Sequence, residues 1–117
     1  MSIEAACHCK SVRLVVAHIP AELTDCNCSI CRRYGSLWAY YSPDDVEVVG
    51  APVQHYKWDD RSIRFERCGR CGCVTHWSAN DKAVNRMGIN ARMFEPSVIK
   101  DVHVRHLDGA TTEEYVD

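Results

Sequence analysis

Eight cysteines in 117 residues leave this chain few ways to fold. They fall in three tight clusters, Cys7-x-Cys9, Cys26-x-Cys28-x-x-Cys31 and Cys68-x-x-Cys71-x-Cys73. Disulfides stabilise a fold mainly by joining distant segments, so cysteines two or three residues apart in every segment gain little from them. Metal sites need such pairs, because a tight turn brings two sulfurs to about 2.3 Å from one Zn²⁺. The spacing therefore predicts metal binding.

Composition and charge narrow the class of protein. The first residues lack the basic and apolar regions of a signal peptide, and no apolar run approaches the roughly 20 residues that span a bilayer. A cytoplasmic protein keeps its thiols reduced, which also favours metal over disulfides. The net charge of −2 argues against nucleic-acid binding, which usually needs a basic face. We therefore expect a soluble cytoplasmic protein with neither a nucleic-acid nor a membrane partner.

The hydrophobic pattern is that of a mainly β protein. Short extended runs separated by turn residues predict strands at 11–19, 36–41, 46–49, 53–58, 62–67, 74–78, 83–89 and 102–107. Asp59-Asp60 reads as a turn, and the one helical turn expected spans 29–34. We expect a single small metal-binding domain over 1–109, followed by an acidic tail, 110–117, that frays. Sites of four sulfurs accept zinc or iron, so the spacing alone does not identify the metal.

The clusters supply enough ligands for two tetrahedral sites. A site of four cysteines is closed and structural, whereas a catalytic site keeps one position for water or substrate. One pairing gives a closed site, here termed the four-cysteine cluster: Cys7, Cys9, Cys68 and Cys71. The open site is then formed by three residues, here termed the triplet: Cys26, Cys28 and Cys31. Spacing alone allows other combinations.

Charge gives the two sites different chemistry. Four thiolates on Zn²⁺ leave two negative charges and a poor Lewis acid, whereas three leave one negative charge and an ion that accepts a further ligand. Arg32 and Arg33 follow the triplet directly, and guanidinium groups pair with carboxylates. We therefore expect the triplet to be catalytic, an anionic thiol to be its fourth ligand, and the two arginines to bind that thiol.

Around these cysteines the sequence resembles the glutathione-dependent formaldehyde-activating enzyme (GFA) family, which also contains centromere protein V. The segments that carry the resemblance are 7–14 (CHCKSVRL), 26–35 (CNCSICRRYG) and 64–72 (RFERCGRCG), with weaker likeness at 88–92 and 108–109. A lone CxxC would be a weak signal, but three cysteine clusters in this order are a specific one.

The resemblance implies a tent-shaped, Mss4-like β fold with two zinc ions per chain. The four-cysteine cluster would hold the structural zinc and the triplet the reactive one. The implied activity is that of a carbon–sulfur lyase of the S-(hydroxymethyl)glutathione synthase type, which condenses glutathione with formaldehyde. In such a reaction zinc holds or activates the thiol, or polarises the aldehyde oxygen.

Two residues depart from the family pattern, and the chain is short beside the named enzyme. Lys10 stands where many members carry glycine. Cys73 occupies a position that is usually small and hydroxylic, so it is a small packing residue, a fourth ligand that closes a site, or a redox-active thiol. Insertions that could shape a glutathione pocket are missing, which leaves the identity of the thiol and of the aldehyde open.

Other interpretations stay open beside the enzyme. The protein could be a zinc-stabilised interaction module without catalysis, or a thiol redox or zinc sensor. His8 is a candidate alternate ligand and His76 a candidate proton shuttle, although a histidine packed in a strand is the simpler interpretation. Trp38, Tyr40 and Tyr41 are a candidate aromatic wall for a ligand, with core packing as the alternative.

Overall fold

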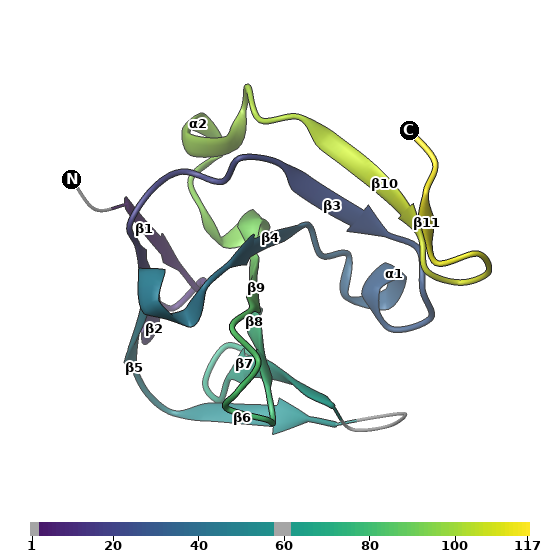
Figure 1. Ribbon diagram of the computed structural model, residues 1–117. Helices are drawn as coiled ribbons and strands as arrows, with labels where there is room; N and C mark the ends of the chain where they lie inside the picture. The colour runs from purple at the N-terminus through teal and green to yellow at the C-terminus, as the bar shows by residue number, and fades with distance from the viewer. Residues whose placement is uncertain (1–2, 58–61) are drawn as a thin grey trace.

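The computed structural model describes residues 3–57 and 62–117 and contains two β-sheets (Figure 1). The smaller sheet has the order β1-β2-β5, formed by β1 (Ile3–Ala6), β2 (Val12–Val16) and β5 (Val46–Gly50). The larger sheet has the order β11-β10-β3-β4-β9-β8-β7-β6. Its strands are β3 (Leu23–Cys26), β4 (Trp38–Tyr41), β6 (Val53–Tyr56), β7 (Ile63–Cys68), β8 (Val74–Ala79), β9 (Met87–Asn90), β10 (Val104–Asp108) and β11 (Glu114–Tyr115). The prediction of a mainly β fold is confirmed.

Strand β2 shows how the sequence pattern builds the core. Its alternating Val12, Leu14 and Val16 are all buried, as the period of two predicts. Leu14 and Val16 pack in the main core between the two sheets, together with Leu23, Ala39, Tyr41, Ile89 and Phe94. The core therefore fixes the small sheet against the middle of the large one.

The large sheet bends around the short helix α1 (Cys31–Tyr34) (Figure 1). Strands β10, β3 and β4 lie on one side of α1 in this view, and β7 and β6 lie on the other. Strand β10 pairs parallel with β3, which places Leu107 beside Cys26. The bend makes one face of the large sheet concave, and the loop from Cys26 to α1 lies on that side.

Several elements differ from the sequence prediction. Strands β1 and β3 were not predicted, because IEAA and LTDC are only four residues long and carry no clear alternation. A second short helix, α2 (Pro96–Ile99), was also missed, and β9 is shorter than the predicted strand 83–89. Residues 110–117 were expected to fray, yet they contain β11, which pairs with β10. The predicted turn at Asp59-Asp60 lies outside the described residues.

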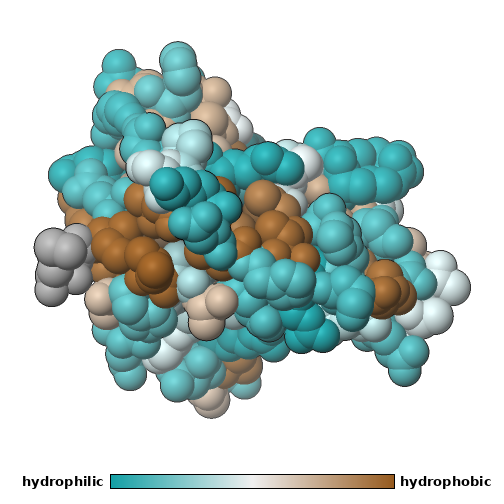
Figure 2. Space-filling view, turned by 90° about the horizontal axis from the view of Figure 1, so that it is seen from above, coloured by the Kyte–Doolittle hydropathy of each residue, from teal (hydrophilic) through white to brown (hydrophobic). Residues whose placement is uncertain are grey.

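The surface mixes polar and apolar regions. Viewed from above, hydrophobic residues gather toward the middle of the molecule and hydrophilic residues surround them (Figure 2). Within 3–57 and 62–117, no helix has the length and apolar character needed to cross a membrane.

Candidate metal centres

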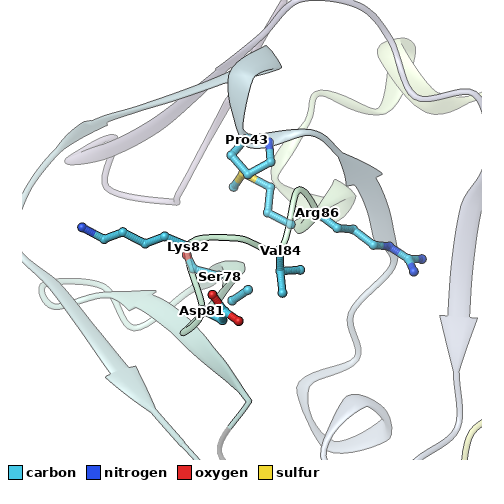
Figure 3. A pocket seen from close by; sticks show the side chains of 8 residues that line it. Pro43, Ser78, Asp81, Lys82, Val84 and Arg86 are labelled. Carbon is cyan, nitrogen blue, oxygen red and sulfur yellow. The ribbon is translucent and has the colours of Figure 1, made fainter.

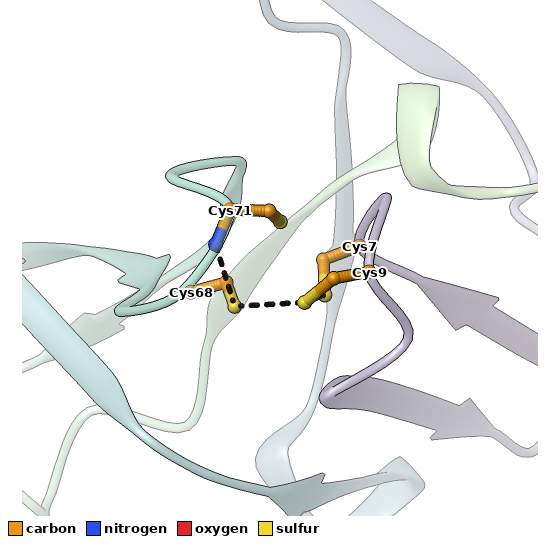
Figure 4. Close-up of side chains that lie close together, drawn as sticks. All are labelled: Cys7, Cys9, Cys68 and Cys71. Carbon is orange, nitrogen blue, oxygen red and sulfur yellow. Dashed lines mark hydrogen bonds between the residues drawn. The ribbon is translucent and has the colours of Figure 1, made fainter.

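The four-cysteine cluster joins two turns that are about sixty residues apart in the sequence (Figure 4). Cys7 and Cys9 lie in the turn after β1, Cys68 ends β7, and Cys71 lies in the turn that leads to β8. The four Sγ atoms all lie within 4.8 Å of one another. The pairing that was inferred by counting ligands is therefore the one that the fold brings together.

The sulfur spacing fits a tetrahedral metal ion. Zn–S bonds of about 2.3 Å require sulfur atoms roughly 3.8 Å apart. Cys9 Sγ lies 3.7 Å from Cys7 Sγ and 3.6 Å from Cys68 Sγ. Backbone N–H groups point at the same sulfurs: Val12 donates to Cys7 Sγ at 3.4 Å, and Arg70 to Cys68 Sγ at 3.3 Å. These residues fit a bound Zn²⁺.

Burial and hydrogen bonding give the thiols of the four-cysteine cluster different pKa values. Hydrogen bonds from the backbone of Cys73 and of Cys9 lower the pKa of the Cys71 thiol to about 5. Burial raises the pKa of Cys7 to about 11, since its side chain is removed from water. Cys7 therefore needs a cation beside it to be held as a thiolate, which is the form that binds metal.

The triplet occupies one short loop on the concave side of the large sheet. Cys26 ends β3, Cys28 lies in the following turn, and Cys31 begins α1. Their Sγ atoms also lie within 4.8 Å of one another, and within the described residues no fourth Cys, His, Asp or Glu joins the group. This is the donor set of an open zinc site.

Specific donors surround the triplet sulfurs. The indole Nε1–H of Trp38 donates to Cys31 Sγ at 3.2 Å, and the backbone N–H of Cys31 lies 3.5 Å from Cys28 Sγ. Burial raises the pKa of Cys31 and of Cys26. At Cys28 burial acts in the same direction, but hydrogen bonds from Cys31 outweigh it and lower the pKa. Cys28 is also only half-buried, so it is the most accessible sulfur of the three.

Aromatic and apolar side chains enclose this site. Trp38 and Phe65 are buried in one cluster with Cys26 and Cys31. The partly buried residues packed against that cluster are Cys28, Ile30, Tyr34, Tyr40, Ile63, Val74, Trp77 and Leu107. Because these groups exclude water, charges at the triplet interact more strongly than they would in solvent.

A segment that sequence reasoning did not assign to the site covers one side of it. Asn27 Nδ2 donates to Asp108 Oδ1 at 3.0 Å, and the Ala110 N–H donates to Asn27 Oδ1 at 3.0 Å. Gly109 lies so close that a Cβ there would be 2.7 Å from Cys26 Sγ. The Asp108-Gly109 pair carried only a weak family likeness, and its contact with the triplet depends on the parallel pairing of β10 with β3.

Arg32 and Arg33 are exposed on α1, beside the triplet. Arg33 Nη1 donates to the carbonyl of Ser29 at 2.7 Å, which fixes its guanidinium against the cysteine loop. A hollow of about 270 Å³ borders the same loop, lined by Ser29, Ile30, Arg33, Tyr34 and Tyr56. Arg33 thus lies where a ligand of the triplet could extend.

The remaining sequence candidates are distributed around the molecule. Cys73 packs with Cys7 and Cys68 beside the four-cysteine cluster. The imidazole of His76 contacts Glu66 and Thr75, and His8 is exposed.

The proposed aromatic wall is divided between the two faces of β4. Trp38 and Tyr40 pack in the apolar cluster around the triplet. The Tyr41 ring packs in the main core, and its hydroxyl donates to the His18 carbonyl at 2.9 Å.

A separate pocket of about 220 Å³ lies away from both cysteine groups (Figure 3). Its lining residues are Pro43, Ser78, Ala79, Asp81, Lys82, Val84, Arg86 and Met87. Figure 3 shows that Lys82 and Arg86 extend from the pocket in opposite directions. The pocket contains no cysteine among its lining residues.

Comparison with known proteins finds a matching family and a similar solved structure. A family model described as "Glutathione-dependent formaldehyde-activating enzyme" matches residues 2–106, a range that includes all eight cysteines. The crystal structure of a Rhodobacter sphaeroides protein, a structural genomics target, is similar with a TM-score of 0.70 and 25% sequence identity. That similarity covers 87% of this chain and 99% of the other. A search of curated proteins finds no significant match.

Proposed function

Since this chain belongs to the glutathione-dependent formaldehyde-activating enzyme family, we propose that it joins a small thiol to an aldehyde at the triplet. The observation that carries the proposal is the difference between the two cysteine groups. One brings four sulfurs together, and the other brings only three. A site that served stability alone would have no use for an open position.

In this proposal the four-cysteine cluster holds a structural Zn²⁺, and the triplet holds a second Zn²⁺. When bound, the second ion would act as a Lewis acid and favour the thiolate form of a substrate thiol. The chain's own contribution is to fix Cys26, Cys28 and Cys31 on one short loop. Trp38 donates to Cys31 Sγ and so reduces that sulfur's negative charge.

The reaction is an addition that needs no oxidant or reductant. The thiol sulfur forms a bond to the carbonyl carbon of the aldehyde, the C=O π bond breaks, and the oxygen takes the proton that the thiol loses. With glutathione and formaldehyde the product is S-hydroxymethylglutathione, and the reverse step is carbon–sulfur cleavage. The enclosing Trp38 and Phe65 limit water access to the triplet, which favours thiol addition over hydration of the aldehyde.

Binding of the thiol also needs groups outside the triplet. In this proposal Arg32 and Arg33 pair with a carboxylate of the substrate, which is supported for Arg33 by its place at the border of the hollow beside the loop. A cytoplasmic location suits this chemistry, because a reducing compartment keeps both the substrate thiol and the eight protein cysteines reduced.

The test measures the rate at which ¹³C-formaldehyde exchanges with its glutathione adduct. Exchange NMR gives this rate with and without the protein. We expect the wild-type protein to accelerate the exchange and Cys28→Ser to return it to the uncatalysed rate while thermal unfolding changes little. Cys73→Ser is the matched control, since it removes a thiol outside the triplet and should keep the acceleration. Full acceleration in Cys28→Ser would contradict the proposal.

The position of Cys73 favours a second candidate function, a thiol redox sensor. The Cys73 thiol contacts that of Cys71, and hydrogen bonds lower the pKa of Cys71 to about 5, so Cys71 is the thiolate of the pair that reacts with peroxide. Peroxide could oxidise this pair to a disulfide, with two electrons passing to the peroxide and two waters formed, which would remove one ligand from the four-cysteine cluster. Mild peroxide should then release one zinc reversibly from the wild type and none from Cys73→Ser. Equal release from both proteins would exclude this role for Cys73.

A further inference from the structure

We propose that Arg86 binds a carboxylate of the thiol substrate and makes the site selective for acidic, peptide-sized thiols. The inference rests on the proposed function of the triplet. In this arrangement one end of the substrate faces Arg32 and Arg33, and the opposite end faces Arg86. A thiol with a carboxylate at each end would therefore be bound at both ends.

The register of the large sheet places the surroundings of Arg86 on the triplet's face. Trp38 and Tyr40 are two residues apart on β4 and therefore point to the same side, and Trp38 contacts Cys31. Tyr40 pairs with Gly88 on β9, and Gly88 pairs with Trp77 on β8. Tyr40 and Trp77 accordingly pack in the same apolar cluster as the triplet sulfurs.

An aromatic stack holds the Arg86 side chain in place. Its Cζ lies 4.0 Å from the centroid of the Tyr40 ring, and the Trp77 ring meets Tyr40 edge-on with centroids 6.2 Å apart. Gly88 makes this arrangement possible, because a Cβ at that position would be 2.0 Å from Trp77 Nε1. A guanidinium fixed in this way loses less conformational freedom when it binds an anion.

The charge of Arg86 is available to a ligand. Arg105, which stacks on Tyr115 nearby, is paired with Glu22 and Asp117. Among the described residues Arg86 is exposed and forms no ion pair, and its guanidinium points away from the pocket that contains Asp81 (Figure 3). An exposed cation held against aromatic rings is suited to bidentate binding of a carboxylate.

The distance from the triplet suits a short peptide. Tyr40 lies two residues along β4 from Trp38, about 6.8 Å at two residues' rise, and the Trp38 indole Nε1 lies 3.2 Å from Cys31 Sγ. Tyr40 also packs in the apolar cluster that contains Cys26 and Cys31. A thiol with one or two further residues reaches from the triplet to the Arg86–Tyr40 stack, since each extended residue spans about 3.5 Å.

The experiment compares an acidic with an uncharged thiol. The zinc-loaded protein is titrated with glutathione or with 2-mercaptoethanol, and the indole N–H resonance of Trp38 reports occupation of the triplet. Arg86→Gln should weaken glutathione binding about tenfold, the scale of one charged hydrogen-bonded contact, and leave 2-mercaptoethanol unchanged. Arg86→Lys should restore part of the loss. Lys82→Gln removes a cation that extends the opposite way and should change neither affinity.

The outcomes separate this inference from the proposed function. Unchanged glutathione affinity in Arg86→Gln, or an equal loss for both thiols, overturns the role of Arg86 while thiol binding at the triplet stands. Failure of the wild-type protein to bind either thiol overturns both. Weaker glutathione binding in Lys82→Gln, equal to that in Arg86→Gln, also contradicts the inference, because it would indicate a general effect of net charge.

Discussion

At the scale of single residues, the same side chain acquires different properties from its surroundings. Hydrogen bonds lower the pKa of Cys71 to about 5, whereas burial raises that of Cys7 to about 11. Both belong to the four-cysteine cluster, so the cluster combines an accessible thiolate with a buried thiol. A bound metal ion would reconcile them, because a divalent cation favours the thiolate at every ligand position.

Lys10 has a backbone conformation that is unfavourable for a residue with a side chain. Its φ of 69° lies in the left-handed region, which costs a residue with a Cβ about 1–2 kcal/mol. Lys10→Gly should therefore stabilise the folded protein by up to about 1 kcal/mol after the greater freedom of glycine in the unfolded chain is subtracted. Lys10→Ala keeps the Cβ and should give no such gain. Thermal unfolding at fixed excess zinc measures both, and equal stability of the two variants would contradict the explanation.

At the scale of elements, the last strand holds one edge of the large sheet. The Tyr115 hydroxyl lies 2.9 Å from that of Thr24, and Arg105 Cζ lies 3.8 Å from the Tyr115 ring centroid. Tyr115→Ala should lower the free energy of unfolding by about 1–2 kcal/mol, since one hydrogen bond and one cation–π contact are lost. Val116→Ala, at a side chain that is 67% exposed, is the control and should have little effect. Equal effects in urea unfolding would mean that the tail frays in solution.

A contact between a carboxylate and an imidazole across β7 and β8 gives the fold a pH dependence through Glu66. Glu66 Oε2 lies 3.2 Å from His76 Nε2 and accepts a hydrogen bond from Ser78 at 2.5 Å. Burial alone would raise the pKa of Glu66, but the contacts with His76 and Ser78 outweigh it and lower the pKa from 4.5 to about 2. The folded pKa is below the unfolded one, so the stabilisation is complete above about pH 5 and is lost as pH falls toward 2.

Glu66→Gln should remove this contribution. We expect it to lower stability at pH 7 by about 1–3 kcal/mol. The difference from wild type should shrink as pH falls from 5 to 2, and measuring a difference cancels the loss of zinc that both proteins undergo in acid. Chemical unfolding at several pH values gives this difference, and one that stays constant with pH would contradict the assignment to Glu66.

The elements also show what the sequence could predict. Counting ligands gave one of the groupings that the spacing allows, and the fold brings the cysteines together in that grouping. The alternation of Val12, Leu14 and Val16 was enough to identify a buried strand face. The four-residue strands β1 and β3 gave no comparable signal, since their side chains become buried only through pairing with other segments.

The surroundings of the triplet could not be predicted from the sequence either, because they too depend on pairing between distant segments. Gly109 meets Cys26 because β10 pairs parallel with β3, and Arg86 meets Tyr40 across the pairing of β9 with β4. Both contacts depend on strand order and register in an eight-stranded sheet. A local pattern contains no information about either, whereas the cysteine clusters carry their chemistry within a few residues.

At the scale of the whole molecule, the two cysteine groups differ in how distant the segments are that they bring together. The four-cysteine cluster brings the turn after β1 next to the β7–β8 turn, and Arg70 Nη1 also donates to Ser11 Oγ between these turns at 3.4 Å. A metal ion held by these four cysteines would close this long loop, restrict the unfolded chain and so stabilise the fold. A metal ion at the triplet would close only the five-residue interval from Cys26 to Cys31 and would contribute little in this way, which agrees with the catalytic role that we propose for it.

The most direct test is the zinc content per chain of reduced protein, measured by elemental mass spectrometry on the wild type and on two variants. The account predicts two zinc ions in the wild type and one in a folded Cys28→Ser. In Cys7→Ser it predicts loss of zinc together with a large loss of stability. A folded wild type that holds no zinc would contradict the account, as would Cys28→Ser that keeps both ions.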